Sequence, residues 1–428
     1  MKDFATSENP RVQAQLNRLG ALSVPDGRLG LETIRCLLAR LDDPHLRLPP
    51  VFHVAGTNGK GSTCAFLRAM LEADGYAVHV TTSPHLVRYN ERIRVGGKLI
   101  GDDRLADLLE QVLDLGADLC PSFFEVTIAA AFAEFARVPA DACVIEVGLG
   151  GRFDATNVLE QPAVCGIAAL GLDHERFLLA PEEGVPTDPL ERIAFEKAGI
   201  AKPGVPLVTQ EYATGMTKAV LDQAMRAGAR PALRGLDWFA DPGGTIVYRD
   251  RWGELALPLP AMPGPHQADN AALAIAMIRH QAIVPVSENA IRSGLMAASW
   301  PARLQRLSAG PLTGNREVWL DGGHNPSAGA ALAAHFGRRR FHLIIGMIAG
   351  KAPRALIEPL SSSIVSISAV PVPTHDWHPA EAFGPQAQAF ADVPAALAAL
   401  PDDRLPVLIA GSLYLAGEVL RLNRQFPD

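Results

Sequence analysis

Residues 51–64 read VFHVAGTNGKGSTC and pass from an apolar, strand-like run into a glycine-rich turn and then into a helical stretch. Glycines at 56, 59 and 61 let the backbone bend so that several N–H groups face one point, while the following helix adds its positive end and Lys60 adds a full charge. The order of strand, turn, lysine, hydroxyl and helix predicts a cradle for the phosphates of a nucleotide. The alternative is a glycine-rich turn that carries a surface lysine.

The loop is a variant of the common pattern G-x-x-x-x-G-K-[ST]. Gly61 directly follows the lysine, so the hydroxyls come later, at Ser62 and Thr63. We therefore expect nucleotide binding by a variant loop.

The composition favours a protein that acts on small molecules. The 428 residues exceed the size at which one core usually stops growing, which predicts two or three domains. Apolar residues make up 48% of the chain and charged residues 20%, and the net charge of -7 gives no electrostatic reason to expect nucleic acid or an anionic membrane as a partner.

The cysteines and the N-terminus indicate a cytoplasmic protein. The 5 cysteines are scattered and lack metal-type spacing, which is typical of reduced thiols. The sequence MKDFATSENPR has no apolar core of a signal peptide, and no apolar run reaches ~18 residues. We expect localisation in the cytoplasm.

Short β-branched runs at 51–54, 77–82, 143–147 and 164–169 alternate with alanine- and leucine-rich stretches of helical period. This alternation predicts a parallel α/β sheet. Ligands collect beyond the carboxyl ends of such strands, so one site should gather the segments that follow them. These segments are GTNGKGS, SPHLVRYNERI, GLGGRFDATN and GLDHE.

The pattern changes twice in the second half of the chain. Residues 233–260 are short polar and aromatic pieces with turns, which predicts β-hairpins at an edge or in a flap. After ASWPAR at 298–303, a second alternating series of strands begins. We expect an N-terminal domain over 1–297 and a C-terminal domain over 298–428.

Several side chains outside the loop are candidates for binding a metal. Ser83 in TTSPH ends a strand and offers a hydroxyl, with a turn cap as the alternative. Glu125 in PSFFEVT is a carboxylate that Mg²⁺ would neutralise if it is buried, with a helix cap or a surface position as the alternative. His174 in GLDHE follows a strand and stands beside Asp173, with a capped turn as the alternative.

Lys197 in ERIAFEKAGI shares a helical face with Ile193 and Ile200, which predicts a partly enclosed amine. Burying an amine is unfavourable unless it is paired, discharged or modified.

Ten segments in order resemble the folylpolyglutamate synthase/dihydrofolate synthase branch of the Mur ligase superfamily. They are HVAGTNGKGS, TSPHLVRYNERIRV, FFEVT, EVGLGGRFDATN, LDH, EKAGI, GPHQADNAALA, WPARLQRL, DGGHNP and GSLYLAG. The resemblance implies a P-loop-type, mainly parallel ATPase domain at the N-terminus, which also holds the folate site, and a smaller Rossmann-like α/β domain at the C-terminus that ligates glutamate.

The resemblance also implies roles for residues at matching positions. ATP contacts would come from Asn58, Gly59, Lys60, Gly61, Asn270, Arg303 and Asp321. Mg²⁺, expected as two ions, would be held by Ser83, Glu125, His174 and a carbamylated Lys197. The substrates would be bound by Leu31, Glu32, Thr33, Asp154, His324 and Ser412. Lys60, Lys197, Asp154 and His324 would serve catalysis, with the nucleotide between the two domains.

The implied reaction is ATP-driven amide formation. A substrate carboxylate attacks the γ-phosphate to give an acyl phosphate, and the amine of L-glutamate then displaces phosphate. The acceptor is expected to be dihydropteroate, a folate that already carries glutamate, or both, and the enzyme a monomer acting on small molecules. The alternatives are a ligase for cell-wall precursors and an ATP-binding regulatory protein without catalysis.

The chain departs from the family pattern at four places. Residues 175–195 form a longer loop than the usual short turn before EKAGI, which we expect to leave the metal site intact. Ala302 replaces the usual Gly in WPAR, and Gly323 replaces the usual Ala in DGGHN. GMIAGKAP lacks an acidic residue that is common in this stretch of the family. This puts in doubt one contact of the second domain with the acyl phosphate or the nucleotide.

Overall fold

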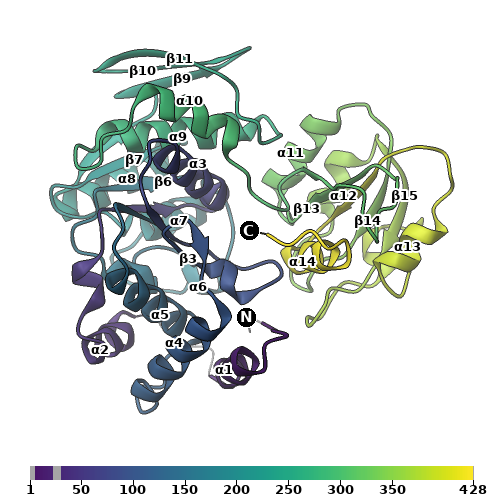
Figure 1. Ribbon diagram of the computed structural model, residues 1–428. Helices are drawn as coiled ribbons and strands as arrows, with labels where there is room; N and C mark the ends of the chain where they lie inside the picture. The colour runs from purple at the N-terminus through teal and green to yellow at the C-terminus, as the bar shows by residue number, and fades with distance from the viewer. Residues whose placement is uncertain (1–4, 23–29, 428) are drawn as a thin grey trace. The chain divides into compact units, whose positions relative to one another are not determined.

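All five residues of strand β1 (Val51–Ala55) are buried, as expected for a strand covered by helices on both faces of a parallel sheet. Figure 1 shows the computed structural model, which describes residues 5–22 and 30–427. The chain forms two compact units. The first includes Arg88–Ala261 and Gln267–Ser299 together with the chain up to Pro84, and the second includes His85–Val87, Met262–His266 and the chain from Trp300 onward.

The first unit is built on an eight-stranded sheet in the order β4-β3-β2-β5-β1-β6-β7-β8. Six strands run parallel, and β3 and β4 extend one edge in antiparallel pairing. The other strands are β2 (Val78–Thr81), β3 (Ile93–Val95), β4 (Lys98–Leu99), β5 (Ala142–Glu146), β6 (Val164–Ile167), β7 (Pro206–Thr209) and β8 (Arg230–Leu233).

Helices pack on this sheet through two apolar clusters. One joins α1, α2, α4 and α5 to β1 and β5, and the other joins α7 and α8 to β6 and β7. The helices are α1 (Pro10–Gly20), α2 (Glu32–Arg40), α3 (Lys60–Ala73), α4 (Asp102–Leu115), α5 (Phe123–Arg137), α6 (Glu175–Leu178), α7 (Pro189–Ala198), α8 (Thr214–Ala227), α9 (His266–His280) and α10 (Glu288–Ala297), with 3-10 turns η1 (Pro44–Arg47), η2 (Tyr89–Arg92) and η3 (Ala155–Val158).

The hairpins expected within 233–260 are present. Strands β9 (Trp238–Pro242), β10 (Ile246–Asp250) and β11 (Gly253–Leu257) pair antiparallel in a separate sheet of the first unit. Trp238 and Tyr248 are buried on one face of this sheet and stack with ring centroids 6.0 Å apart. The turn-forming residues of this segment therefore connect three antiparallel strands, as the sequence predicts.

The second unit contains a six-stranded sheet in the order β12-β13-β17-β14-β15-β16, parallel except for β12. Its core includes residues of α13 and α14 in one apolar cluster and of α11 and α12 in another. The strands are β12 (Gln305–Arg306), β13 (Val318–Asp321), β14 (Phe341–Ile345), β15 (Ile364–Ala369), β16 (Ala387–Ala389) and β17 (Val407–Ala410), and the helices are α11 (Pro326–Phe336), α12 (Arg354–Leu360), α13 (Val393–Ala399) and α14 (Leu413–Leu422), with η4 at Ala380–Phe383.

The predicted fold class is confirmed: a large, mainly parallel α/β sheet is followed by a smaller α/β unit. In the described parts of the chain, no helix combines the length and the apolar character that crossing a bilayer requires.

Candidate active site

The glycine-rich loop connects β1 to α3 at the carboxyl end of the first sheet. Gly56 has φ +150 and Gly59 has φ +84, conformations that L side chains rarely adopt. A Cβ atom at Gly56 would lie 2.9 Å from the Cβ of Ala168, and one at Gly59 would lie 2.2 Å from Oδ1 of Asn270. Glycine is therefore required at both positions by backbone angle and by space.

The loop uses some of its N–H groups to hold its own shape. Thr57 and Asn58 both donate their backbone N–H to the carbonyl oxygen of Ala169, at 2.8 and 3.1 Å. The first bond of α3 runs from the N–H of Thr63 to the carbonyl of Gly59, so the N–H groups of residues 60–62 precede the first intrahelical bond. These three groups are the ones suited to phosphate oxygens.

Lys60 and Asn270 flank this helix end. The Nζ of Lys60 donates to the carbonyl of Gly56 at 3.0 Å, which holds the ammonium group over the loop. Asn270 comes from α9, and its Nδ2 donates to Oε1 of Gln267 at 3.1 Å. The fold thus brings the side chain of residue 270 against Gly59, as the predicted nucleotide site requires.

Ser83 lies beside a buried carboxylate, that of Glu146, which is not among the predicted metal ligands. Its backbone N–H donates to Oε2 of Glu146 at 3.1 Å. Glu146 is the last residue of β5, stands in register with Val54 of β1, and is only 5% exposed. A buried carboxylate needs a cation or hydrogen bonds, and a hydroxyl next to a carboxylate is a donor set that fits Mg²⁺. The sequence does carry a signal for this residue: Glu146 is the acidic last residue of the otherwise apolar strand ACVIE.

Glu125 has a different local role. It is the third residue of α5, and its Oε2 accepts from the N–H of Ser122 at 2.8 Å while its own N–H donates to Oγ of Ser122 at 3.2 Å. This is a capping box, the alternative considered above for this residue. The carboxylate that contacts Ser83 is that of Glu146, so we infer that Glu146 is the stronger candidate for a metal ligand.

His174 follows β6 in a left-handed conformation with φ 52. Its N–H donates to Oδ1 of Asp173 at 2.9 Å, and its Nε2 lies 3.8 Å from Oδ2 of the same residue. Within residues 5–22 and 30–427, no three side chains of His, Cys, Asp or Glu gather closely enough to hold a metal by themselves. A Mg²⁺ site here would therefore also draw on hydroxyl, water and phosphate oxygens, as Mg²⁺ sites commonly do.

Lys197 is enclosed, as its helical face predicted, with 3% of its surface exposed. Its Nζ donates to the carbonyl of Gly56 at 2.9 Å, so both Lys60 and Lys197 contact the same loop residue. Burial and the charge of Lys60 lower the pKa of Lys197 to about 7, although Asp173, Asp154 and Glu196 oppose the shift. A lysine in this state is partly neutral at physiological pH and can react as an amine.

An ion-pair network surrounds the helix that carries Lys197. Arg152 contacts Glu182 at 2.6 Å and Glu196 at 2.8 Å, and Arg192 contacts Glu182 at 2.9 Å and Glu196 at 3.0 Å. Glu182 belongs to the long loop between α6 and α7. Its two arginines lower the pKa of its carboxyl to about 2. The loop that departs from the family pattern is thus fastened to α7.

Asp154 is buried in the turn after the GLGG segment. Its Oδ2 accepts from the N–H of Leu149 at 2.8 Å, and its Oδ1 accepts from the N–H of Thr156 at 3.0 Å and from the hydroxyl of Thr156 at 2.6 Å. The same hydroxyl lies 2.8 Å from Nε2 of His53 on β1. Burial raises the pKa of Asp154. The geometry gives Asp154 a role in shaping the turn beside the cradle.

Leu31, Glu32 and Thr33, which are predicted to bind substrate, lie at the start of α2. Leu31 precedes the helix and, like Phe123 and Phe124, packs against the apolar cluster that joins α1, α2, α4 and α5 to the sheet. Glu32 is exposed in the first turn and Thr33 is half-buried. Residues 23–29, which precede this segment, lie outside the described residues.

The second unit gathers its predicted residues at the carboxyl ends of β13 and β17. Asp321 ends β13 and accepts from the N–H groups of Leu304 at 2.8 Å and Gly323 at 2.7 Å. Asp321 is in register with Ala410 of β17, and Ser412 follows as the N-cap of α14. Arg303 is half-buried and His324 follows the β13 strand end. Within this unit, the arrangement places the predicted residues on one edge, where ligands of α/β sheets bind.

Comparisons with known proteins agree with this arrangement. No family model matches the chain. The chain is 35% identical over 362 residues to the dihydrofolate synthase/folylpolyglutamate synthase of Bacillus subtilis, an alignment that covers 78% of this chain and 79% of the relative. Among solved structures, it is similar to Escherichia coli FolC in complex with DHPP and ADP, with a TM-score of 0.84, 32% identity, and coverage of 97% and 98% of the two chains.

A second similar structure is a bifunctional folylpolyglutamate synthase/dihydrofolate synthase with Mn, AMPPNP and L-glutamate bound. It has a TM-score of 0.83 and 31% identity, and the match covers 98% of this chain and 99% of the other. Sequence and structure therefore agree over nearly the whole length of both units, and the chain belongs to the folylpolyglutamate synthase/dihydrofolate synthase family.

Proposed function

We propose that this protein is an ATP-dependent ligase that adds L-glutamate to dihydropteroate, to folyl(poly)glutamates, or to both, with ADP and phosphate as products. Its family relatives carry these activities in their names, and one is solved with a nucleotide analogue, Mn and L-glutamate. The observation that carries the proposal is the arrangement around Gly56. Lys60 and Lys197 both bind its carbonyl, beside the helix end that suits phosphate oxygens.

In the proposed reaction, the loop residues 58–61 and Asn270 bind the nucleotide. Lys60 and the N–H groups at the start of α3 stabilise the negative charge that develops on the γ-phosphate as the substrate carboxylate attacks it. Mg²⁺, when bound, would supply Lewis-acid polarisation of the phosphate oxygens. Ser83, Glu146 and His174 are the residues proposed to hold it.

Lys197 is proposed to act as a carbamate. An amine whose pKa is about 7 is substantially neutral at physiological pH, which is the form that adds CO₂. Addition of CO₂ to the neutral amine forms an N–C bond and releases one proton; starting from the ammonium form, two protons leave in all, so that an anion replaces a cation. This change would replace repulsion between Lys197 and Lys60 by attraction, and it would provide oxygen atoms for a cation next to the cradle.

The second domain, proposed as residues 298–428, would supply residues that bind the nucleotide and residues that bind L-glutamate. Arg303 and Asp321 are proposed to bind the nucleotide, and His324 and Ser412 to bind the incoming L-glutamate. We propose residues 1–297 as the ATP-binding domain, with the folate near Leu31, Glu32 and Thr33. Asp154 is proposed to support activity by holding the turn after β5.

We further propose a monomer that works in the cytoplasm. All five cysteines are free thiols in the structure, in keeping with a reducing compartment. Light scattering of the purified protein tests the oligomeric state directly.

A phosphate-release assay tests the function. Dihydropteroate and tetrahydrofolate are compared as acceptors, each with L-glutamate, ATP and Mg²⁺, and the product is identified by mass. Release that depends on an acceptor and on glutamate supports the proposal, and the preferred acceptor assigns the activity. A cell-wall ligase would require a nucleotide-linked peptide precursor instead, and a regulatory protein without catalysis would release no phosphate with either acceptor.

A further inference from the structure

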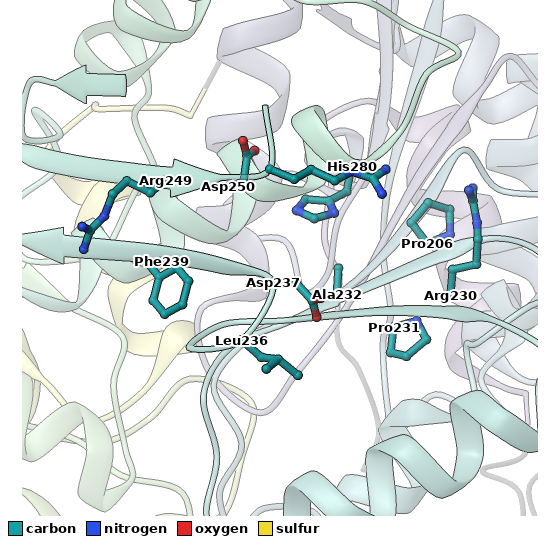
Figure 2. A pocket seen from close by; sticks show the side chains of 11 residues that line it. Pro206, Arg230, Pro231, Ala232, Leu236, Asp237, Phe239, Arg249, Asp250 and His280 are labelled. Carbon is teal, nitrogen blue, oxygen red and sulfur yellow. The ribbon is translucent and has the colours of Figure 1, made fainter. Parts of the chain in front are cut away.

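The first unit contains a cavity of about 670 Å³ that the proposed reaction does not use. Figure 2 shows its lining side chains, which come from β7 and β8, from β9 and β10, from the loops that follow β8 and β10, and from the end of α9. This volume is within the range of small-molecule sites, about 300 to 1,000 Å³.

The cavity lies along the edge strand β8, three strands away from β1, which leads into the nucleotide cradle. Pro206 and Arg230, which line it, are the first residues of β7 and β8. The cradle follows the carboxyl end of β1, and β1, β6, β7 and β8 all run parallel. A ligand in this cavity would therefore bind away from the loop that holds Lys60.

Three arginines line the cavity, and two have no carboxylate partner. Arg230 donates through Nε to the carbonyl of Gly204 at 2.8 Å, and the guanidinium carbon of Arg251 lies 4.1 Å from the centroid of the Trp252 ring. Among the described residues, neither forms an ion pair. Arg249 pairs with Asp241 at 3.0 Å, but both side chains are more than half exposed, where such a pair contributes little.

The acidic residues of the lining are already engaged. Both oxygens of Asp250 accept from the guanidinium of Arg279, so their charges cancel. Oδ2 of Asp237 accepts from the N–H of Leu233 at 2.8 Å. The cavity therefore keeps a positive excess, in a protein whose net charge is -7.

His280 and Phe239 are the uncharged aromatic rings of the lining. Nε2 of His280 is shielded by the protein and has no hydrogen-bond partner in it, and burial lowers the pKa of the ring so that it stays neutral. In Figure 2 the ring faces the space enclosed by the other labelled side chains. Phe239 is 41% exposed and offers an apolar face. The surface offered to a ligand combines forked cationic donors with an aromatic ring.

We propose that this cavity binds a small organic polyanion with at least two carboxylate or phosphate groups. Guanidinium groups match both kinds of oxyanion with paired hydrogen bonds, and a concave site concentrates their field. The anionic groups of such a ligand could be the carboxylates of a polycarboxylate chain or the phosphates of a phosphorylated compound. The inference is independent of the proposed ligase reaction, because the site shares no residue with the cradle.

Calorimetric titration of the full chain tests the proposal, with γ-linked tetraglutamate and tripolyphosphate as separate probes. The variants are R230A/R251A for the cavity, K60A for the cradle, and R18A as a control for an exposed arginine elsewhere. We expect the double variant to weaken binding of at least one probe about tenfold or more, while R18A and K60A leave that binding unchanged. Which probe responds identifies carboxylate or phosphate as the recognised group.

Binding of both probes by R230A/R251A with wild-type affinity would overturn the proposal, as would no binding of either probe by wild-type protein. Loss of all binding in K60A alone would also overturn it, because the probes would then occupy only the cradle. Circular dichroism confirms that the double variant is folded.

Discussion

The Nζ of Lys197 lies 2.9 Å from the carbonyl oxygen of Gly56, which also accepts from Lys60 at 3.0 Å. Two amines thus share one acceptor, and one of them is fully enclosed in protein. Because burial and the neighbouring charge both disfavour its protonated form, Lys197 is the reactive amine of the pair.

The stability of the protein should depend on pH through Lys197. Its pKa is about 7 in the folded chain and near the ordinary value of 10.5 in the unfolded chain. Between these values the unfolded chain binds the proton and the folded chain does not, so stability should rise as pH increases from 7 towards 10.5. Urea unfolding at pH 7 and 9.5 in CO₂-free buffer should show a smaller rise for K197M than for wild type.

Lys218 provides the control for this measurement, since it is exposed and pairs with Asp222 at 2.7 Å. K218M should keep the wild-type rise. Equal rises in wild type and K197M would show that Lys197 is charged in the folded protein.

Glu146 and Glu125 should respond differently to the same substitution. E146Q removes the charge beside Ser83, and we expect turnover to fall by about 100-fold or more with a higher Mg²⁺ requirement. E125Q preserves a capping side chain at the start of α5, so its Mg²⁺ requirement should stay that of wild type. Activity titrated against Mg²⁺ compares the two. A raised requirement in E125Q with a normal one in E146Q would restore Glu125 as the ligand.

These two acids show what the sequence alone can and cannot predict. The strand, turn and helix around Lys60 and the enclosure of Lys197 are local patterns, and both were predictable from spacing. Glu125 and Glu146 each adjoin an apolar run, so local pattern cannot tell a helix cap from a carboxylate that meets Ser83 across strands. Likewise, the contact between Gly59 and Asn270 exists only because α9 packs on the loop.

Gly59 should be intolerant of alanine for a reason beyond its backbone angle. Its Cβ would lie 2.2 Å from Oδ1 of Asn270, whereas Gly75, with a similar φ of +89, has nothing within 4 Å of such an atom. G75A should therefore report backbone strain alone, about 1 kcal/mol, and leave nucleotide binding intact. G59A should cost more stability than G75A and in addition weaken ATP binding, about tenfold or more, because Asn270 must move. Equal ATP affinity of the two variants, measured by calorimetry, would contradict this account.

Glu182 should stabilise the helix that carries Lys197, although it lies in a loop that the family pattern lacks. It contacts Arg152 at 2.6 Å and Arg192 at 2.9 Å, and E182Q would leave both arginines with Glu196 alone. We expect E182Q to lower the free energy of unfolding by about 1 kcal/mol at pH 7, measured with urea. Because the pKa of Glu182 is lowered to about 2, this contribution is complete above pH 4.5 and is lost as the pH falls towards 2. The neighbouring Glu183 is exposed and forms no ion pair among the described residues, so E183Q should match wild type. If E182Q and E183Q unfold at the same urea concentration, the network does not stabilise α7, and the loop is only a connection between helices.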